Sequence, residues 1–149
     1  MTYGLCTNRV FTPELLLELV SCSVGDERHL MTREHPIILV VEDEAIIRME
    51  VCEGLSNEGY RVADFPCGDA ACSYLLTGGP CDLLLTDVRM PGGCDGLQLA
   101  NWVEKHRPNT PIIIMSSHLT YAQIGDREFV AKPFETTFLI NKVAEMLAA

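Results

Sequence analysis

Basic residues are scarce in this sequence of 149 residues. Its 11 Lys and Arg residues stand against 21 Asp and Glu residues, which gives a formal net charge of -10 at pH 7. Proteins that bind nucleic acid through its phosphates need clustered Lys and Arg side chains, and the sequence shows no basic helix-turn-helix pattern. We therefore expect no direct DNA binding and no attached DNA-binding domain.

Long hydrophobic runs are missing as well. The apolar patch at residues 15–24 is interrupted by Glu18 and has no basic leader, so it is too short to span a membrane and does not resemble an export signal. Thr12 as an N-cap and Pro13 in the first turn instead predict a short amphipathic helix. The sequence thus favours a cytoplasmic protein without membrane contacts.

Paired cysteines are also absent, although cysteine itself is not rare. The seven cysteines are an odd number, form no C-x-x-C pair and have no His at metal-ligand spacing. We interpret them as reduced, mostly buried thiols rather than as disulfides or a zinc site. They are Cys6, Cys22, Cys52, Cys67, Cys72, Cys81 and Cys94.

The chain divides near residue 36. Residues 1–35 contain the short helix and a polar linker, and they carry no recognisable motif. Met31 stands just before the first strong strand and could itself be a natural start. We expect residues 1–35 to be an N-terminal extension and residues 36–149 to be one domain, which is long enough to bury a core.

Strands and helices alternate regularly from residue 37 onward. The β-branched run at residues 37–41 predicts a buried strand, and residues 45–58 show the apolar spacing of a helix that Gly59 caps. Further strands are predicted at residues 60–65, 83–87, 111–115 and 128–131, and further helices at residues 69–76, 96–106 and 138–147. This alternation is typical of an α/β fold with a parallel sheet and helices on both faces.

Polar residues stand where four of these strands end. Glu42 and Asp43 follow the first strand, Asp87 closes the third, Ser116 follows the fourth and Lys132 follows the fifth. A single Asp after a strand is often only a turn residue. In an open parallel sheet, however, the strands end at the same edge, where ligands bind, and we therefore expect these side chains to converge.

Three carboxylates in one crevice would repel one another. Two like charges about 4 Å apart repel by roughly 1–4 kcal/mol at the effective dielectric constants between water and a protein surface. Lys132 offsets part of this repulsion, and a hard divalent ion would offset more. A site with oxygen ligands and open positions suits Mg²⁺, which keeps several waters and accepts phosphate oxygens.

The combination of these motifs resembles a known family, the receiver domain of bacterial two-component response regulators. The resemblance covers about residues 36–149 and implies a flavodoxin-like, doubly wound sheet of five parallel strands in the order 2-1-3-4-5. It also implies a stand-alone signalling module whose only activity is its own phosphorylation and dephosphorylation. The motifs that carry it are Glu42-Asp43, Asp87-Val88-Arg89-Met90-Pro91, Ser116 and Lys132-Pro133.

The resemblance implies a role for each acidic residue. Asp87 would accept a phosphoryl group from the phosphohistidine of a sensor histidine kinase or a histidine phosphotransfer protein. Glu42 and Asp43 would hold Mg²⁺ together with Asp87 and the backbone carbonyl of Arg89. Because the family often has Asp at the first position, Glu42 is a variant that would reach the ion through water. Lys132 would contact the phosphoryl oxygens, and the resemblance implies a cis bond to the proline that follows it.

Other positions match the family's switch and tuning residues. Ser116 corresponds to the switch hydroxyl, with Ser117 as the competing candidate, and Phe129 corresponds to the aromatic switch, although an aromatic on a short strand can simply belong to the core. Arg89 and His118 correspond to variable positions that tune hydrolysis of the phosphoryl group. His118 can equally be an ordinary loop histidine.

The sequence departs from the family in two places. The loop at residues 90–96 has one residue more than the usual Pro-x-x-Asp-Gly loop. The segment at residues 119–127 is shorter than the family's usual fourth helix and contains Gly125, so we expect that helix to be shortened or absent.

Two alternatives from other classes compete with a phosphorylatable receiver that signals through protein contacts or drains phosphate as a sink. A haloacid-dehalogenase-like phosphatase also uses an aspartyl nucleophile and Mg²⁺, but it needs a second acid two residues later, where this chain has Arg89. A pseudo-receiver binds partners without phosphorylation, but no key residue is missing here.

Overall fold

A single parallel sheet forms the centre of the domain. The protein is described by a computed structural model, which covers residues 35–117 and 124–149. Within these residues five strands pair in the order β2-β1-β3-β4-β5, and every neighbouring pair is parallel. The strands are β1 (Ile37–Val41), β2 (Arg61–Phe65), β3 (Leu83–Asp87), β4 (Ile112–Ser116) and β5 (Glu128–Ala131).

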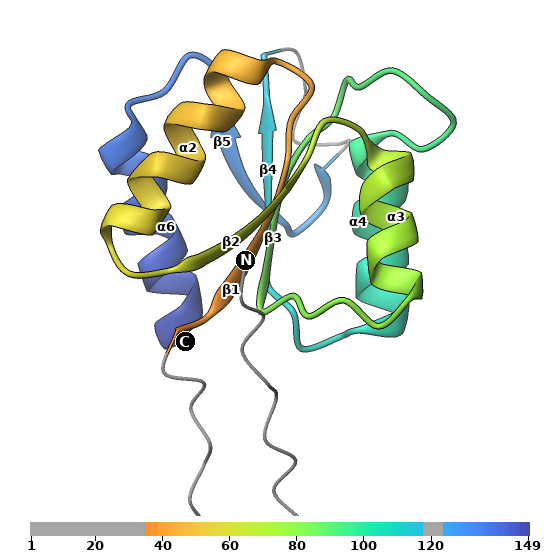
Figure 1. Ribbon diagram of the computed structural model, residues 1–149. Helices are drawn as coiled ribbons and strands as arrows, with labels where there is room; N and C mark the ends of the chain where they lie inside the picture. The colour runs from red at the N-terminus through yellow and green to blue at the C-terminus, as the bar shows by residue number, and fades with distance from the viewer. Residues whose placement is uncertain (1–34, 118–123) are drawn as a thin grey trace, which may run out of the picture. The chain divides into compact units, whose positions relative to one another are not determined.

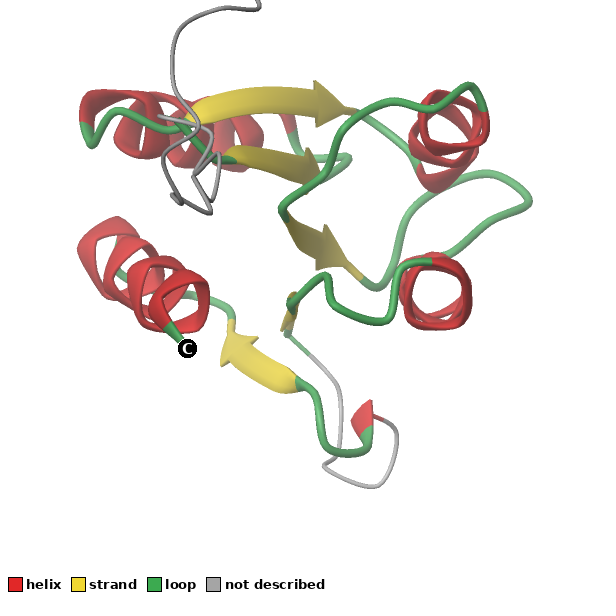
Figure 2. Ribbon diagram, turned by 90° about the horizontal axis from the view of Figure 1, so that it is seen from below, coloured by secondary structure: helices red, strands yellow, loops and turns green. Residues whose placement is uncertain are grey.

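Helices cover both faces of this sheet. Helices α2 (Ala45–Asn57) and α6 (Thr136–Ala148) lie on one side, and α3 (Gly68–Leu76) and α4 (Gly96–His106) lie on the other (Figure 1). Figure 2, turned by 90°, shows the strands between these two layers. No helix in the described part of the chain is long and apolar enough to cross a membrane.

The apolar core consists of two layers, one on each side of the sheet. Because side chains alternate along a strand, Leu84 packs in the layer below α3 and α4, whereas Leu83 and Leu85 pack in the layer below α2 and α6. All five residues of β1, β3 and β4 are buried. Burial on both faces explains why these strands read as unbroken apolar runs.

The predicted fold class and strand order are confirmed, and the ends of the described elements differ from the prediction by at most two residues. Helix α6, for example, begins at Thr136 and not at the predicted residue 138. The prediction left out the two threonines before Phe138 because they carry no apolar signal. The predicted N-terminal helix, the shortened fourth helix and His118 fall wholly or mainly on residues 1–34 and 118–123, which lie outside the described residues.

The prediction of mostly buried cysteines is wrong for the described part of the chain. Cys81 is buried, but Cys52, Cys67, Cys72 and Cys94 are only half-buried. These four lie on helices, at a helix cap or in a loop, where part of each side chain faces solvent.

Helix α4 begins directly behind the end of β3. Its N-cap Asp95 accepts a hydrogen bond from the Gln98 N–H at 2.8 Å, and the Gln98 side chain accepts one from the Asp95 N–H at 3.0 Å. Such a capping box typically stabilises a helix by about 1 kcal/mol. The first helical residue, Gly96, is buried against the main chain of Asp87, because a Cβ there would lie only 1.8 Å from the Asp87 carbonyl oxygen.

We predict that Gly96→Ala destabilises the domain by about 1–3 kcal/mol, the usual cost of overpacking, because the added methyl group meets backbone that cannot move aside freely. Thermal unfolding followed by circular dichroism measures the loss. Gly93→Ala is the matched control, since its Cβ would meet only the Asp69 side chain, at 3.4 Å. Equal melting temperatures for the two variants would contradict the close contact between α4 and β3.

Candidate functional site

A pocket of about 330 Å³ lies at the carboxyl edge of the sheet. The loop after β1, the end of β3, the end of β4 and the residue after β5 all contribute to its wall. The lining residues are Asp43, Glu44, Asp87, Arg89, Ser116, Ser117 and Lys132. A larger hollow of about 600 Å³ lies elsewhere, beside α4 and residues 124–128, and contains none of the predicted site residues.

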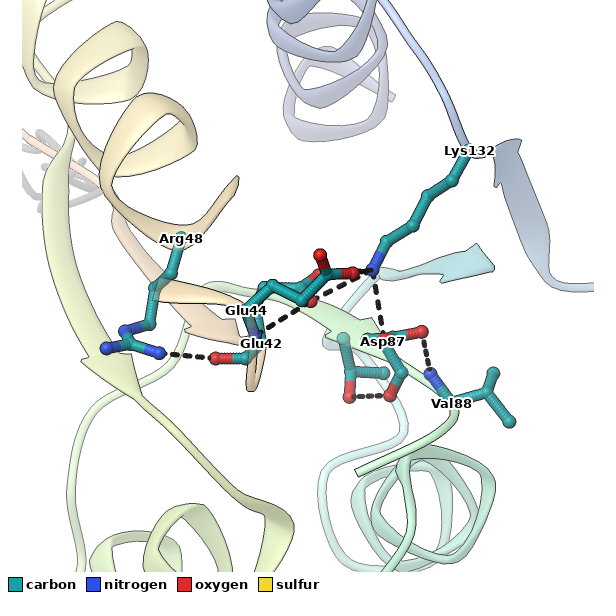
Figure 3. A network of polar contacts seen from close by, with 7 residues as sticks. Glu42, Glu44, Arg48, Asp87, Val88 and Lys132 are labelled. Carbon is teal, nitrogen blue, oxygen red and sulfur yellow. Dashed lines mark hydrogen bonds and ion pairs between the residues drawn. The ribbon is translucent and has the colours of Figure 1, made fainter. Parts of the chain in front are cut away.

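Lys132 bridges two carboxylates in this pocket. Its Nζ donates hydrogen bonds of 2.9 Å to Glu42 Oε1 and of 2.9 Å to Asp87 Oδ2, and Figure 3 shows the side chain reaching from beyond β5 toward both groups. The exposed fraction of the side chain is 7% for Lys132, 0% for Glu42 and 9% for Asp87. The three charges therefore interact with little screening by solvent.

Glu42 is the most deeply buried member of this group. Its Oε2 lies 2.7 Å from Lys132 Nζ, but the direction does not fit a hydrogen bond, so this buried oxygen has no hydrogen-bond partner among the described residues. Burial raises the pKa of Glu42, although the bond from Lys132 counteracts the rise. Burial alone would lower the pKa of Lys132, but the hydrogen bonds to Glu42 and Asp87 outweigh it and raise the pKa, which keeps the ammonium charged.

Asp87 is held in one orientation. Its Oδ1 accepts a hydrogen bond of 2.6 Å from the Val88 N–H, and its Oδ2 faces Lys132. The Thr86 hydroxyl donates a 2.8 Å hydrogen bond to the Asp87 main-chain carbonyl. Because its main chain and both side-chain oxygens are fixed, the carboxylate presents a defined position in the pocket.

The acidic cluster fits a hard divalent cation. One carboxylate oxygen from each of Glu42, Asp43 and Asp87 lies within 4.8 Å of the others. The donors are all oxygen, and Lys132 provides one positive charge against three negative ones. Asp43 is exposed whereas the other two carboxylates are buried, so this side chain offers the freest oxygens of the three.

The remaining predicted residues occupy the rim of the pocket or its neighbourhood. Ser116 is buried at the end of β4 and Ser117 is exposed beside it, and both line the pocket. Arg89 is exposed on the rim. Phe129 is half-buried and packs against the core layer below α3 and α4. The peptide bond between Lys132 and Pro133 is cis, as the resemblance implied.

Arg48 was missed by the sequence analysis. Its guanidinium donates a 2.6 Å hydrogen bond to the Glu42 main-chain carbonyl and a 3.1 Å bond to Asp64 Oδ2. It thereby ties the end of β1 to β2 from the side opposite Lys132 (Figure 3). A basic residue one helical turn after the acidic pair was the available signal, but its partner Asp64 lies on another strand and was not evident.

Comparisons with known proteins agree with this geometry. A family model of the response regulator receiver domain matches residues 38–144. The chain is 36% identical over 118 residues to the DNA-binding transcriptional regulator NtrC of a Bradyrhizobium species, covering 74% of this chain and 24% of that protein. It therefore spans about a quarter of the length of this relative.

Two solved structures match this chain over nearly their whole length. The response regulator receiver protein from Sinorhizobium medicae is 31% identical, with a TM-score of 0.74, and the match covers 79% of this chain and 98% of that one. The receiver domain of NtrX from Brucella abortus is 30% identical, with a TM-score of 0.67, covering 75% and 98%. With the family match across most of the described fold and an acidic pocket at the sheet edge, this chain belongs to the response regulator receiver domain family.

Proposed function

We propose that the protein accepts a phosphoryl group on Asp87 from the phosphohistidine of a sensor histidine kinase or a histidine phosphotransfer protein. The observation that supports this most directly is the setting of the Asp87 carboxylate, which is held between Lys132 and the Val88 N–H in a pocket that opens at the sheet edge. Membership in the receiver family supports the same assignment.

The proposed transfer exchanges one bond for another. The P–N bond of the donor phosphohistidine breaks as a P–O bond to the Asp87 carboxylate forms, and the product is an acyl phosphate. Catalysis of such a transfer consists mainly of positioning and charge neutralisation. Lys132 suits charge neutralisation, because its ammonium already lies 2.9 Å from Asp87 Oδ2. From this position it can contact the oxygens of a phosphoryl group on Asp87.

Mg²⁺ is the proposed cofactor. Asp43, Asp87 and the Arg89 carbonyl would hold it, and the bound ion would supply further neutralisation of negative charge. Glu42 has both oxygens within 3 Å of Lys132, which supports contact with the ion through water rather than directly.

Ser116 and Phe129 are the proposed switch residues. They belong to neighbouring strands, where Ile114 pairs with Phe129 and Ser116 pairs with Ala131, so alternation along the strands puts both on the same face of the sheet. Ser117 stays a competing hydroxyl because it lines the same pocket. Arg89 and His118 are the proposed tuning residues, the second of which lies outside the described residues.

The wider role follows the family in outline. Receiver domains are generally non-enzymatic signalling modules, and we propose that this one signals through protein contacts or drains phosphate as a sink. The division into an extension at residues 1–35 and a receiver at residues 36–149 stays a prediction, as do the absence of direct DNA binding and the cytoplasmic location. No observation favours the phosphatase or the pseudo-receiver alternative.

We predict that Asp87→Asn abolishes labelling of the protein by acetyl phosphate or a cognate kinase in the presence of Mg²⁺, because the amide cannot form an acyl phosphate. Gel analysis of radiolabelled protein measures the label, which alkali should remove from the unmodified chain. Asp126→Asn is the control, since this exposed carboxylate lies in the turn before β5. Undiminished labelling of Asp87→Asn would refute the assignment.

We predict that Asp43→Asn weakens Mg²⁺ binding about tenfold or more, because the ion loses a charged carboxylate that would coordinate it directly. Isothermal titration calorimetry measures the Kd without any phosphoryl donor. Glu44→Gln is the control, because Glu44 lines the pocket but its Oε1 is 3.9 Å from Lys132 and its side chain is 65% exposed. Equal losses in both variants would indicate a diffuse acidic patch instead of a defined site.

We predict opposite effects of Lys132→Met on two measurements. Labelling falls at least about tenfold because the phosphoryl charge is no longer neutralised, while Mg²⁺ binds several-fold more tightly because the carboxylates lose their present counter-charge. Lys142→Met is the control, since this lysine pairs with Glu128 and Glu145 away from the pocket. Loss of both properties together would point to unfolding or to a different role for Lys132.

A further inference from the structure

Two thiols meet where the loop after β3 rests on α3, and neither lines the pocket that contains Asp87. Cys72 lies on α3 and Cys94 lies in the loop between β3 and α4, and their Sγ atoms are 3.2 Å apart. Both side chains are half-buried, which leaves them within reach of a small molecule from solvent. Within residues 35–117 and 124–149, no other pair of cysteine thiols is in hydrogen-bond contact.

The approach of the two thiols is set by the backbone. A Cβ on Gly68, the first residue of α3, would lie 2.1 Å from the Cys94 carbonyl oxygen, so the loop rests directly on the start of the helix. The Gly93 N–H donates a 2.8 Å hydrogen bond to Asp69 Oδ2. Contacts on the residue before Cys94 and on Cys94 itself therefore hold the loop at the distance that brings the sulfur atoms together.

The loop that carries Cys94 is the one with the additional residue. Gly92 adopts a φ of 120° there, a conformation that favours glycine. This loop leads from Asp87 and Arg89 to Asp95 at the start of α4. A covalent link at Cys94 would restrain the segment that directly follows the proposed phosphoacceptor.

The short distance lets one thiol react with an oxidised form of the other. Both side chains are half-buried, so either thiol can meet the oxidant first. The thiol that is still reduced then lies 3.2 Å from the oxidised sulfur.

We propose that Cys72 and Cys94 form a disulfide when the protein meets a hydroperoxide, and that this bond fastens the β3–α4 loop to α3. One of the two sulfur atoms attacks a peroxide oxygen and the O–O bond breaks, which yields a sulfenic acid and one water from hydrogen peroxide. The sulfur of the other cysteine then attacks the sulfenic acid sulfur, the S–O bond breaks and a second water leaves. Two thiols lose two electrons and two protons, and one hydrogen peroxide is reduced to two waters.

The test treats the full chain with hydrogen peroxide, blocks the remaining thiols and maps the peptides by mass spectrometry. The expected result is a peptide pair joined through Cys72 and Cys94 that dithiothreitol separates. In Cys94→Ser, Cys72 should stop at a sulfenic acid that dimedone traps. In the control Cys52→Ser, the joined pair should form as in the unmodified chain. Absence of the pair, or preferential linkage of Cys72 to Cys67 or another cysteine, would overturn the proposal.

Hydrogen exchange tests the restraint on the loop. The amides of residues 92–95 should exchange about threefold or more slowly in the oxidised chain than in the reduced chain, because the link suppresses local opening. Exchange in α6, on the opposite face of the sheet, should be unchanged. Equal exchange of residues 92–95 in both states would refute the fastening of the loop. Neither readout requires phosphoryl transfer, so the result is independent of the function proposed for Asp87.

Discussion

The pairing of Lys132 with Glu42 and Asp87 is the interaction on which the site depends. A buried carboxylate is costly without a counter-charge, and here two of them share one ammonium at 2.7–2.9 Å. Removing one partner of such a buried pair typically costs about 3–5 kcal/mol. The lysine thus links the end of β1 to the end of β3 from beyond β5, and it holds two negatively charged groups together.

The parallel sheet makes this arrangement possible. Strands β1, β3 and β4 are buried on both faces, so their only polar residues are those at the carboxyl ends. Close packing behind the edge then fixes the polar ends precisely. Gly96 brings α4 against the Asp87 main chain, and Arg48 ties the Glu42 carbonyl to β2. Burial of the two apolar layers stabilises the fold and offsets the repulsion among the carboxylates of Glu42, Asp43 and Asp87.

The same close packing also fixes the position of the loop after Asp87, which carries Cys94. Its additional residue is accommodated against the start of α3, where the contacts of Gly68 and Asp69 hold it. This brings Cys94 beside Cys72.

Much of the fold and of the candidate site was predictable from local sequence. Unbroken apolar runs such as residues 37–41 and 83–85 identify buried parallel strands, and Asp87 and Lys132 stand at strand ends whatever the details of packing. Arg48 and Thr86 were not predictable, because their partners are main-chain carbonyls whose orientation no pattern reveals. The exposure of the cysteines was misjudged, because it depends on how far each helix and loop stands out from the sheet.

The sequence by itself determined the order of strands and helices along the chain and the chemical type of the residue at each strand end, since both follow from local periodicity and side-chain identity. Only the tertiary structure decided which of those groups touch. In the folded domain both carboxylate oxygens of Glu42 lie within 3 Å of Lys132 Nζ, and the Asp43 side chain faces solvent. The Sγ atoms of Cys72 and Cys94 are 3.2 Å apart. Such contacts join residues distant in the chain, and their distances depend on the packing of whole elements, which no short stretch of sequence encodes.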